Sequence, residues 1–366
     1  MRRSYVTPSG AASLLACKLR VGFASEPKSG KRHTGSPATR LGTVCHKVLE
    51  AAARGDLGRA DEPEWADRFA QAWTASLGSQ LAELAACEGP RPWPSPDRWP
   101  FYAQRLVATK RVARELSVEA ADPSFDCFTE DELISSDGTL RGQPDLIVRA
   151  PVHEVRDYKT GPVADEHDVV REDYALQVQL YAVLEHENFG TWPERGLLIP
   201  LPGAARVVDV EPVLAEQART RVRDALTAYN ASVEADEIAD LGAPSPETCR
   251  YCEYAPHCIA FWAAWDDGWA DHGLTAAVGT VEEIRRAMRG GMTIDIAVES
   301  GLSADGLLSV HGLDATALPL LSILSPGDAI ALVGLRPKAP GHAEPGRQLR
   351  IGVALRSAGR AQNETA

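Results

Sequence analysis

The chain has 366 residues, 44% of them hydrophobic, and carries a formal net charge of −13. This length suffices for one large domain and a small one, with a sizeable buried core. No run of about 18 apolar residues occurs, which excludes a membrane-spanning helix. The first apolar run is too short and interrupted for a secretory signal. We therefore expect a cytoplasmic protein, and seven cysteines in so long a chain do not indicate a disulfide scaffold.

Positive charge is concentrated at the N-terminus. Residues 1–47 contain nine Lys and Arg against one acid, Glu26, which leaves 29 basic and 50 acidic residues for the remainder. A basic arm on an acidic body suits an anionic partner held at one face. The alternative is a solvated basic terminus. The candidate contacts to such a partner are Lys18, Arg20, Lys31, Arg32, Arg40 and Lys47.

The first 260 residues alternate between helical and strand patterns. Residues 1–41 predict a short helix and then a loop rich in Gly, Ser and Pro. Helical spacing follows from Leu41 to a stop at Gly55, and again over 64–86 and 99–121. Period-two patterns then predict strands, with SSDGT as a hairpin turn. These strands are 125–134, 139–150, 152–159, ERGLLIPL and ARVVDV, and the further helices are 168–187 and 213–235.

The composition changes after about Gly273. VEEIRRAMRGG predicts a short helix, whereas MTIDIAVES, DAIALVGLRP and RQLRIGVALRS predict strands. We expect a domain over residues 1–270 followed by a small β-rich domain over 275–358. An OB-like barrel would suit this tail, but no aromatic residue follows Trp269 on which a base could stack. A packing or partner-binding role is therefore favoured for it.

Two aspartates and a lysine interrupt otherwise apolar strands. Asp145 belongs to a G-x-P-D sequence, and Asp157 and Lys159 are two residues apart in the next strand. Side chains two apart share one face of a strand. Carboxylates are the ligands that Mg²⁺ prefers, and an ammonium could orient a water or stabilise developing negative charge. The alternative is a surface hairpin with ordinary ion pairs.

Three further polar residues strengthen the metal-site interpretation. Gln177 and Tyr181 are spaced i, i+4 on the helix that follows, so they share a face. His46 lies early in an upstream helix and could offer a neutral imidazole to a metal. The alternatives are a half-buried amphipathic helix and an ordinary helical histidine.

The motifs G-x-x-x-H, G-x-P-D, D-Y-K-T-G and Q-x-x-x-Y together resemble the RecB-type branch of the PD-(D/E)XK nuclease superfamily, over about residues 1–260. The resemblance implies an α/β restriction-endonuclease-like core: a mixed central sheet flanked by helices, with a helical N-terminal part. It implies that Mg²⁺ or Mn²⁺ is bound by His46, Asp145, Asp157 and the carbonyl of Tyr158. Lys159 would be catalytic, and Gln177 and Tyr181 would support the site and the DNA.

Three cysteines form a C-x2-C-x5-C run, Cys249, Cys252 and Cys258, a strong metal-site signal. The run resembles iron–sulfur nucleases of the AddB type and of CRISPR adaptation exonucleases. This resemblance implies a [4Fe–4S] cluster with Cys17 as fourth ligand, although Lys18 stands where the family often has proline. Zinc, with neighbouring His257 as fourth ligand, is the alternative. Cys45, Cys87 and Cys127 read as ordinary buried cysteines.

These motifs predict a metal-dependent nuclease that hydrolyses DNA. The resemblance implies single-stranded DNA ends as substrate, hence exonuclease action, in repair, recombination or defence. No Walker A pattern occurs, so any unwinding would come from a partner such as a helicase. One alternative is a catalytically inactive iron–sulfur DNA-binding subunit of a larger nuclease–helicase complex. Another is a zinc-stabilised RNA-binding or regulatory protein.

Overall fold

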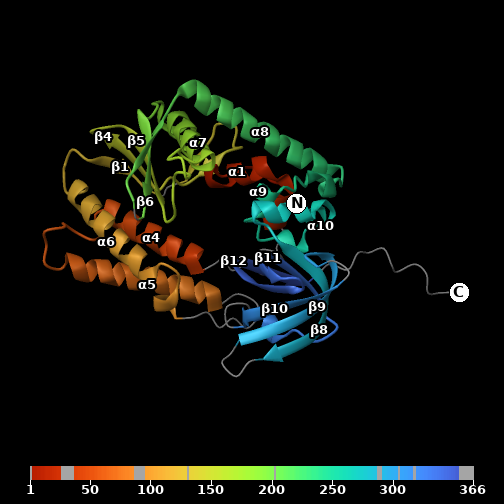
Figure 1. The fold of residues 1–366 in the computed structure, drawn as a ribbon. Coiled ribbons are helices and arrows are strands. Elements are labelled where there is room, and N and C mark those ends of the chain that lie inside the picture. Colours follow the sequence, from red (N-terminus) through yellow and green to blue (C-terminus); the bar gives the residue numbers. More distant parts are fainter. Residues whose placement is uncertain are drawn as a thin grey trace. The chain divides into compact units, whose positions relative to one another are not determined.

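The computed structural model describes residues 2–25, 37–85, 95–129, 132–201, 203–286, 291–303, 306–315 and 319–353. The chain divides into two compact units (Figure 1). Unit 1 comprises Met1–Lys18, Ser25–Glu88 and Ser95–Glu237, and unit 2 comprises Leu19–Ala24, Gly89–Pro94 and Ile238–Ala366. Within the described residues, no helix combines the length and apolar character that crossing a bilayer would require.

Unit 1 is built on a five-stranded mixed sheet. Its strands lie in the order β1 (Asp126–Phe128), β4 (Leu146–Ala150), β5 (Glu154–Lys159), β6 (Arg195–Pro200) and β7 (Arg206–Asp209). The pair β5–β6 is parallel and the other pairs are antiparallel. Parallel neighbours require a crossover, and helix α7 (Glu172–Phe189) provides it. The fold class predicted for this part of the chain is therefore confirmed.

Two groups of helices accompany the sheet. α4 (Pro37–Ala53) contacts both α5 (Trp65–Ala85) and α6 (Tyr102–Glu119), next to the short η1 (Pro96–Arg98). α7 contacts β5 and β6, and it also packs against α1 (Pro8–Ala16) and α8 (Pro212–Glu234). Buried Val178 of α7 packs with Leu198 of β6 and Val208 of β7, so α7 covers one face of the sheet.

A proline breaks the strand predicted over 139–150. The structure has β3 (Arg141–Gly142), which pairs with β2 (Leu133–Ile134), and then β4 in the main sheet. Pro144 has no N–H to give to a ladder, so the chain leaves β3 there and Asp145 emerges immediately before β4. The predicted strand 125–134 likewise divides into β1 and β2.

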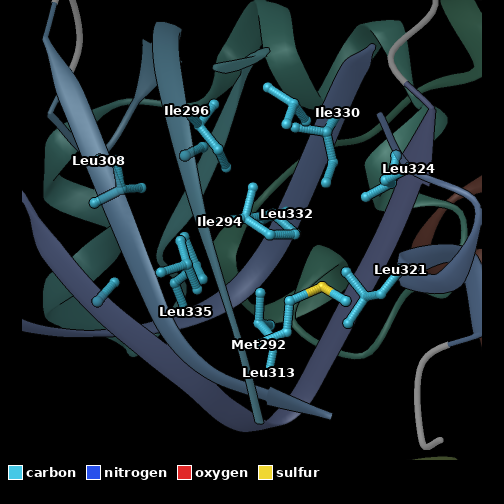
Figure 2. Packing of buried hydrophobic residues seen from close by; sticks show 14 of the residues in the cluster. Met292, Ile294, Ile296, Leu308, Leu313, Leu321, Leu324, Ile330, Leu332 and Leu335 are labelled. Atoms are coloured by element: carbon cyan, nitrogen blue, oxygen red, sulfur yellow. The ribbon is translucent and has the colours of Figure 1, made fainter. Parts of the chain in front are cut away.

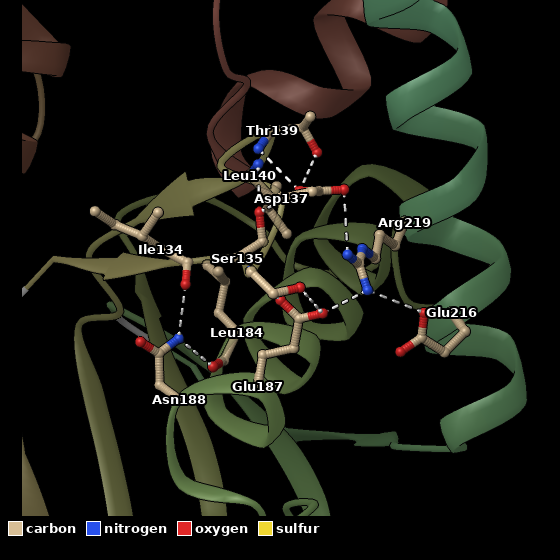
Figure 3. A network of polar contacts seen from close by, with 11 residues as sticks. Ile134, Ser135, Asp137, Thr139, Leu140, Leu184, Glu187, Asn188, Glu216 and Arg219 are labelled. Carbon is tan, nitrogen blue, oxygen red and sulfur yellow. Dashed lines mark hydrogen bonds and ion pairs between the residues drawn. The ribbon is translucent and has the colours of Figure 1, made fainter.

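The turn between β2 and β3 is held by a network centred on Asp137 (Figure 3). Its Oδ1 accepts hydrogen bonds from Ser135 and Thr139, and its Oδ2 lies 3.2 Å from Arg219 of α8. Arg219 also pairs with Glu187 of α7 at 2.5 Å. Burial alone would raise the pKa of Asp137, but these donors outweigh it and hold the pKa well below its usual range. The predicted hairpin turn is therefore confirmed, and it is tied to two helices.

Unit 2 contains a closed five-stranded barrel with the strand order β10–β12–β11–β8–β9. The strands are β8 (Ala276–Arg286), β9 (Gly291–Gly301), β10 (Leu307–Asp314), β11 (Ala329–Ala339) and β12 (His342–Val353), and η5 (Pro319–Ser322) precedes β11. β10 and β12 run parallel, and the other neighbours run antiparallel. Aliphatic side chains including Ile294, Ile330 and Leu332 fill the interior (Figure 2).

Short helices link unit 1 to this barrel in the sequence. They are η2 (Ile238–Leu241), α9 (Pro246–Cys249), η3 (Ala255–His257), α10 (Ile259–Ala264) and η4 (Asp267–His272). α2 (Lys18–Ser25) belongs to unit 2 over most of its length. Cys249, Cys252 and Cys258 lie here in an aromatic cluster with Phe23, Tyr254 and Phe261.

The helix predicted over 281–291 is wrong, because Val281–Arg286 belongs to strand β8. The register shifts between Val281 and Glu283, where β8 bulges against β9. Such an extra residue resets the alternation of faces. Val281 and Ile284 therefore both face the barrel core at a spacing that imitates a helix. Strand β10 was not predicted at all, since Ser309, His311 and Gly312 interrupt its apolar pattern.

Candidate active site

The motif residues of unit 1 gather where β4 begins and β5 ends. Asp145 directly precedes β4, while Asp157 and Lys159 lie on β5. His46 comes from α4, and Gln177 and Tyr181 come from α7. The structure therefore brings together side chains that are separated by up to 135 positions in the sequence.

Asp157, Lys159 and Gln177 form a closed set of contacts. Gln177 donates from Nε2 to Asp157 Oδ1 at 2.9 Å and accepts from Lys159 Nζ at 2.8 Å. Lys159 Nζ also lies 2.6 Å from Asp157 Oδ2 as an ion pair. This Oδ2 is buried, and Lys159 is its partner. Gln177 thus fixes both charged side chains, and each Asp157 oxygen has one partner.

His46, Asp145 and Tyr158 form a second set beside the first. His46 Nδ1 lies 2.9 Å from Asp145 Oδ1, and the backbone N–H of Tyr158 donates to Asp145 Oδ2 at 2.8 Å. Burial lowers the pKa of His46, but the adjacent Asp145 carboxylate outweighs it, and the net shift is upward. Asp145 is therefore anchored to the strand that carries Asp157.

Two motif glycines allow these close approaches. Gly42 lies one turn before His46 in α4. A Cβ at Gly42 would lie 3.3 Å from Oγ1 of Thr160, the residue that follows Lys159 in the chain. A Cβ at Gly142 would lie 2.7 Å from Pro8 Cδ and 3.0 Å from Tyr181 Cε1. The Tyr181 hydroxyl donates to the Gln143 carbonyl at 2.9 Å, and the side chain is 5% exposed. Tyr181 thus holds the turn that carries Asp145.

The two carboxylates repel one another. Burial raises the pKa of Asp157 and the neighbouring Asp145 raises it further, against the attraction of Lys159. A divalent cation would relieve this repulsion, and the oxygen donors fit Mg²⁺ or Mn²⁺. Among the described residues, no three His, Cys, Asp or Glu side chains are arranged as they stand to hold a metal ion. Binding a cation between the carboxylates would therefore replace the His46–Asp145 and Lys159–Asp157 contacts.

The basic residues predicted to contact an anionic partner are divided between the two units, and two of them lie outside the described residues. Arg40 of α4 pairs with Glu83 and donates to Gln80, and Lys47 pairs with Glu50 at 2.7 Å. Lys18 and Arg20 are half-buried and fall in different units. Lys31 and Arg32 lie outside the described residues.

The predicted cluster cysteines also fall in different units. Cys17 ends α1 in unit 1, and the other three belong to unit 2. Cys249 and Cys252 are buried, and Arg350 of β12 donates to their backbone carbonyls at 3.0 and 2.5 Å. Burial lowers the pKa of Arg350, and its attraction to the two cysteines opposes that shift. Cys45 is buried as predicted, Cys127 is half-buried, and Cys87 lies outside the described residues.

Sequence reasoning missed a pocket of 570 Å³ beside Lys159, with Arg105 of α6 in its wall. Arg105 is 7% exposed and lies on the buried stripe of α6 with Ala108, Val112 and Leu116. An arginine at an apolar position of a helical pattern was the signal that could have identified it.

An α/β core that presents two carboxylates and a lysine from adjacent strands is the arrangement expected of a nuclease. A family model of the PD-(D/E)XK nuclease superfamily matches residues 5–259, and the chain belongs to this superfamily. Nucleases of this superfamily generally use divalent metals such as Mg²⁺ and act on DNA.

Comparison with individual proteins adds little to this family assignment. No curated protein matches the chain. A solved structure titled "Crystal structure of SSO0001" is similar at 16% identity. The similarity covers 70% of this chain and 85% of that one, with a TM-score of 0.31.

Proposed function

We propose that the protein is a Mg²⁺- or Mn²⁺-dependent deoxyribonuclease that acts as an exonuclease on single-stranded DNA ends, in repair, recombination or defence. The observation that carries the proposal is the contact set of Asp157, Lys159 and Gln177 beside Asp145. The single-strand and RecB-type features rest on the motif resemblance alone.

Each residue has a role in this proposal. When bound by His46, Asp145, Asp157 and the Tyr158 carbonyl, the cation would acidify a water and neutralise charge on the phosphate. Lys159 orients the attacking water or stabilises the negative charge that develops in the transition state. Gln177 bonds to both Asp157 and Lys159 and so orients them, and Tyr181 holds the turn before Asp145. Because the Tyr181 side chain is buried, its proposed role is to position Asp145 rather than to contact DNA.

Metal removal tests the proposal. We expect purified protein to cleave end-labelled single-stranded DNA with Mg²⁺ or Mn²⁺, and to lose that cleavage with a chelator. Cleavage should return when metal is added back. Asp145→Ala protein purified in the same way should not cleave, which would exclude a contaminating nuclease as the source of the activity. If a folded wild-type protein cleaves neither single- nor double-stranded DNA with either metal, the catalytically inactive binding-subunit alternative replaces this one.

We further propose that Cys17, Cys249, Cys252 and Cys258 hold a [4Fe–4S] cluster. Support comes from three thiols within ten residues, from the burial of two of them, and from half-buried Arg350 beside their loop. A cationic guanidinium stabilises the thiolate form that metal binding requires.

Cys252→Ser tests the cluster. We expect it to remove most of the iron and acid-labile sulfide from anaerobically purified protein, and to lower thermal stability and cleavage together. Cys127→Ser is the matched control, because this half-buried thiol only donates weakly to the Ala53 carbonyl at 3.7 Å. Zinc in place of iron, or full activity in a well-folded cluster-free variant, would contradict the proposal.

The barrel is proposed to be an OB-like module over about residues 275–358, with a partner-binding role. Its five strands close in a Greek-key order that includes the parallel β10–β12 pair. One of its surface hollows is lined in part by acids, namely Glu282, Glu283, Asp295 and Glu299. Such a surface disfavours a DNA backbone and suits a protein partner, for which a helicase is one candidate.

A further inference from the structure

The pocket beside Lys159 has the lining of an anion site. None of the described residues that line it is acidic, although the chain as a whole carries a charge of −13. Its polar wall consists of cationic or hydroxyl side chains and one imidazole, namely Thr39, Thr43, His46, Lys47, Arg105 and Thr160. A concave surface with such a lining raises the local concentration of anions.

Arg105 is a buried cation without an acidic partner among the described residues. Its Nη1 donates to the Ala38 carbonyl at 2.6 Å and its Nη2 to the Thr160 carbonyl at 3.2 Å. Its Nε is buried and finds no acceptor. Burial lowers the pKa of Arg105, which shows the cost of desolvating this charge. A buried charge that lacks a counterion is destabilising, and a bound anion would remove that cost.

The other wall groups leave room for a tetrahedral oxyanion. The exposed Thr43 hydroxyl bonds only weakly to the Thr39 carbonyl, at 3.4 Å, so it can turn toward a ligand. A Cβ at Gly161 would meet nothing within 4 Å. Lys47 is already paired with Glu50, so Arg105 supplies the main uncompensated charge. Guanidinium groups bind phosphate with directed, charge-assisted hydrogen bonds.

The pocket adjoins the proposed catalytic residues. Thr160 follows Lys159 in the chain, and His46 belongs both to the pocket wall and to the Asp145 contact. The ring of Tyr174, another wall residue, lies 4.6 Å from Lys159 Nζ. A nucleic acid strand with one phosphate at Asp157 would therefore bring a neighbouring phosphate to this pocket.

We infer that Arg105, with the hydroxyls of Thr43 and Thr160, forms a phosphate subsite that binds a nucleic acid strand next to the bond being cleaved. The inference rests on the proposed nuclease function for its position, but it makes a binding prediction of its own. The bound group is either an internal backbone phosphate or a terminal one, since both present the same oxygens.

The test measures binding of a short single-stranded oligonucleotide in chelator, where cleavage does not interfere. The oligonucleotide carries a 3′ fluorophore and either a 5′-phosphate or a 5′-hydroxyl. Arg105→Gln removes the charge and keeps a donor for the two carbonyls. Thr43→Glu leaves all the Arg105 contacts in place and adds a negative charge at the pocket. Thr74→Glu on α5 is its control, because this exposed threonine makes the same hydroxyl contact to a carbonyl four residues earlier.

We expect Arg105→Gln and Thr43→Glu each to weaken oligonucleotide binding by about 10- to 100-fold. Each should also lower the slope of log affinity against log salt by about one. Thr74→Glu should bind like the wild type. An equal loss for both oligonucleotides assigns an internal phosphate, whereas a loss confined to the 5′-phosphorylated one assigns the terminus.

Two outcomes would overturn the inference. One is wild-type affinity and salt slope in folded Arg105→Gln and Thr43→Glu, and the other is the absence of oligonucleotide binding by the wild type. Because the assay needs no cleavage, a protein that binds through Arg105 and Thr43 but never cuts DNA would refute the nuclease proposal and keep the subsite. A protein that cuts DNA, but whose two variants bind the oligonucleotide as tightly as the wild type, would refute the subsite and keep the nuclease proposal.

Discussion

Lys159→Met is expected to reduce single-turnover DNA cleavage by about 10²- to 10³-fold, the usual effect of removing one preorganised electrostatic group. The ammonium is preorganised because Gln177 and Asp157 hold it from two sides, at 2.8 and 2.6 Å, and the Tyr174 ring lies against it. Methionine keeps most of the side-chain volume and removes the charge. The rate constant should be measured at saturating enzyme with Mg²⁺, so that DNA affinity does not enter.

Lys110→Met is the matched control for this variant. Lys110 lies on the exposed side of α6, where its ammonium is 5.8 Å from the Phe69 ring, and it is not among the residues that line the site pocket. The same change in charge and shape at Lys110 should leave the cleavage rate within about twofold of the wild-type rate, because a single exposed charge contributes little interaction energy. A Lys159→Met protein that cleaves as fast as Lys110→Met would remove Lys159 from the mechanism.

The folding stability of Lys159→Met must be measured beside its activity. Asp157 is 2% exposed and would lose its ammonium partner, which destabilises a buried carboxylate. We expect the denaturation midpoint to fall while the protein remains folded at assay temperature. Loss of cleavage in a sample that still shows a cooperative unfolding transition is then a catalytic effect.

The local geometry of the motif residues was accessible from the sequence because it depends on short-range rules. Two residues along a strand share a face, and the structure places Asp157 and Lys159 in contact. Four residues along a helix share a face, and Gln177 and Tyr181 both point into the site region. The catalytic and metal-binding roles of these residues remain predictions, since geometry alone does not measure them.

Other features depend on long-range packing that no local pattern encodes. The bulge in β8 lies where its pairing with the neighbouring strand β9 shifts between Val281 and Glu283, and it gives this strand an apolar spacing that resembles a helix. Arg105 lies near Lys159 only because α6 packs on α4 and reaches the carbonyls of Ala38 and Thr160. Ion pairs likewise engage Arg40 and Lys47, which the charge count alone had made candidates for binding DNA.

Replacing Gly142, the glycine of G-x-P-D, is expected to have a large effect on stability, because close packing rather than a turn requires glycine at this position. Gly142→Val should lower the free energy of unfolding by about 2–4 kcal/mol, the cost of overpacking plus a lost hydrogen bond. The added Cβ would meet Pro8 of α1 and the Tyr181 ring of α7. Both residues are buried, so neither can move away without disturbing the packing around it. Urea denaturation measures the change.

Two further variants separate the causes of this effect. Tyr181→Phe removes only the hydrogen bond to the Gln143 carbonyl and should cost about 1 kcal/mol. Gly78→Ala, on the exposed side of α5 where a Cβ meets nothing within 4 Å, should instead stabilise the protein by about 0.5–1 kcal/mol.

Gly142→Val should also slow DNA cleavage more than Tyr181→Phe does, although neither residue touches a reacting atom. Displacing Tyr181 frees the Gln143 carbonyl, and the turn from Gln143 to Asp145 then loses its tether to α7. Asp145 would move relative to Asp157, and catalytic geometry tolerates little such movement. If Gly142→Val were as stable and as active as Gly78→Ala, the close contact of β3, α1 and α7 would have no part in positioning Asp145.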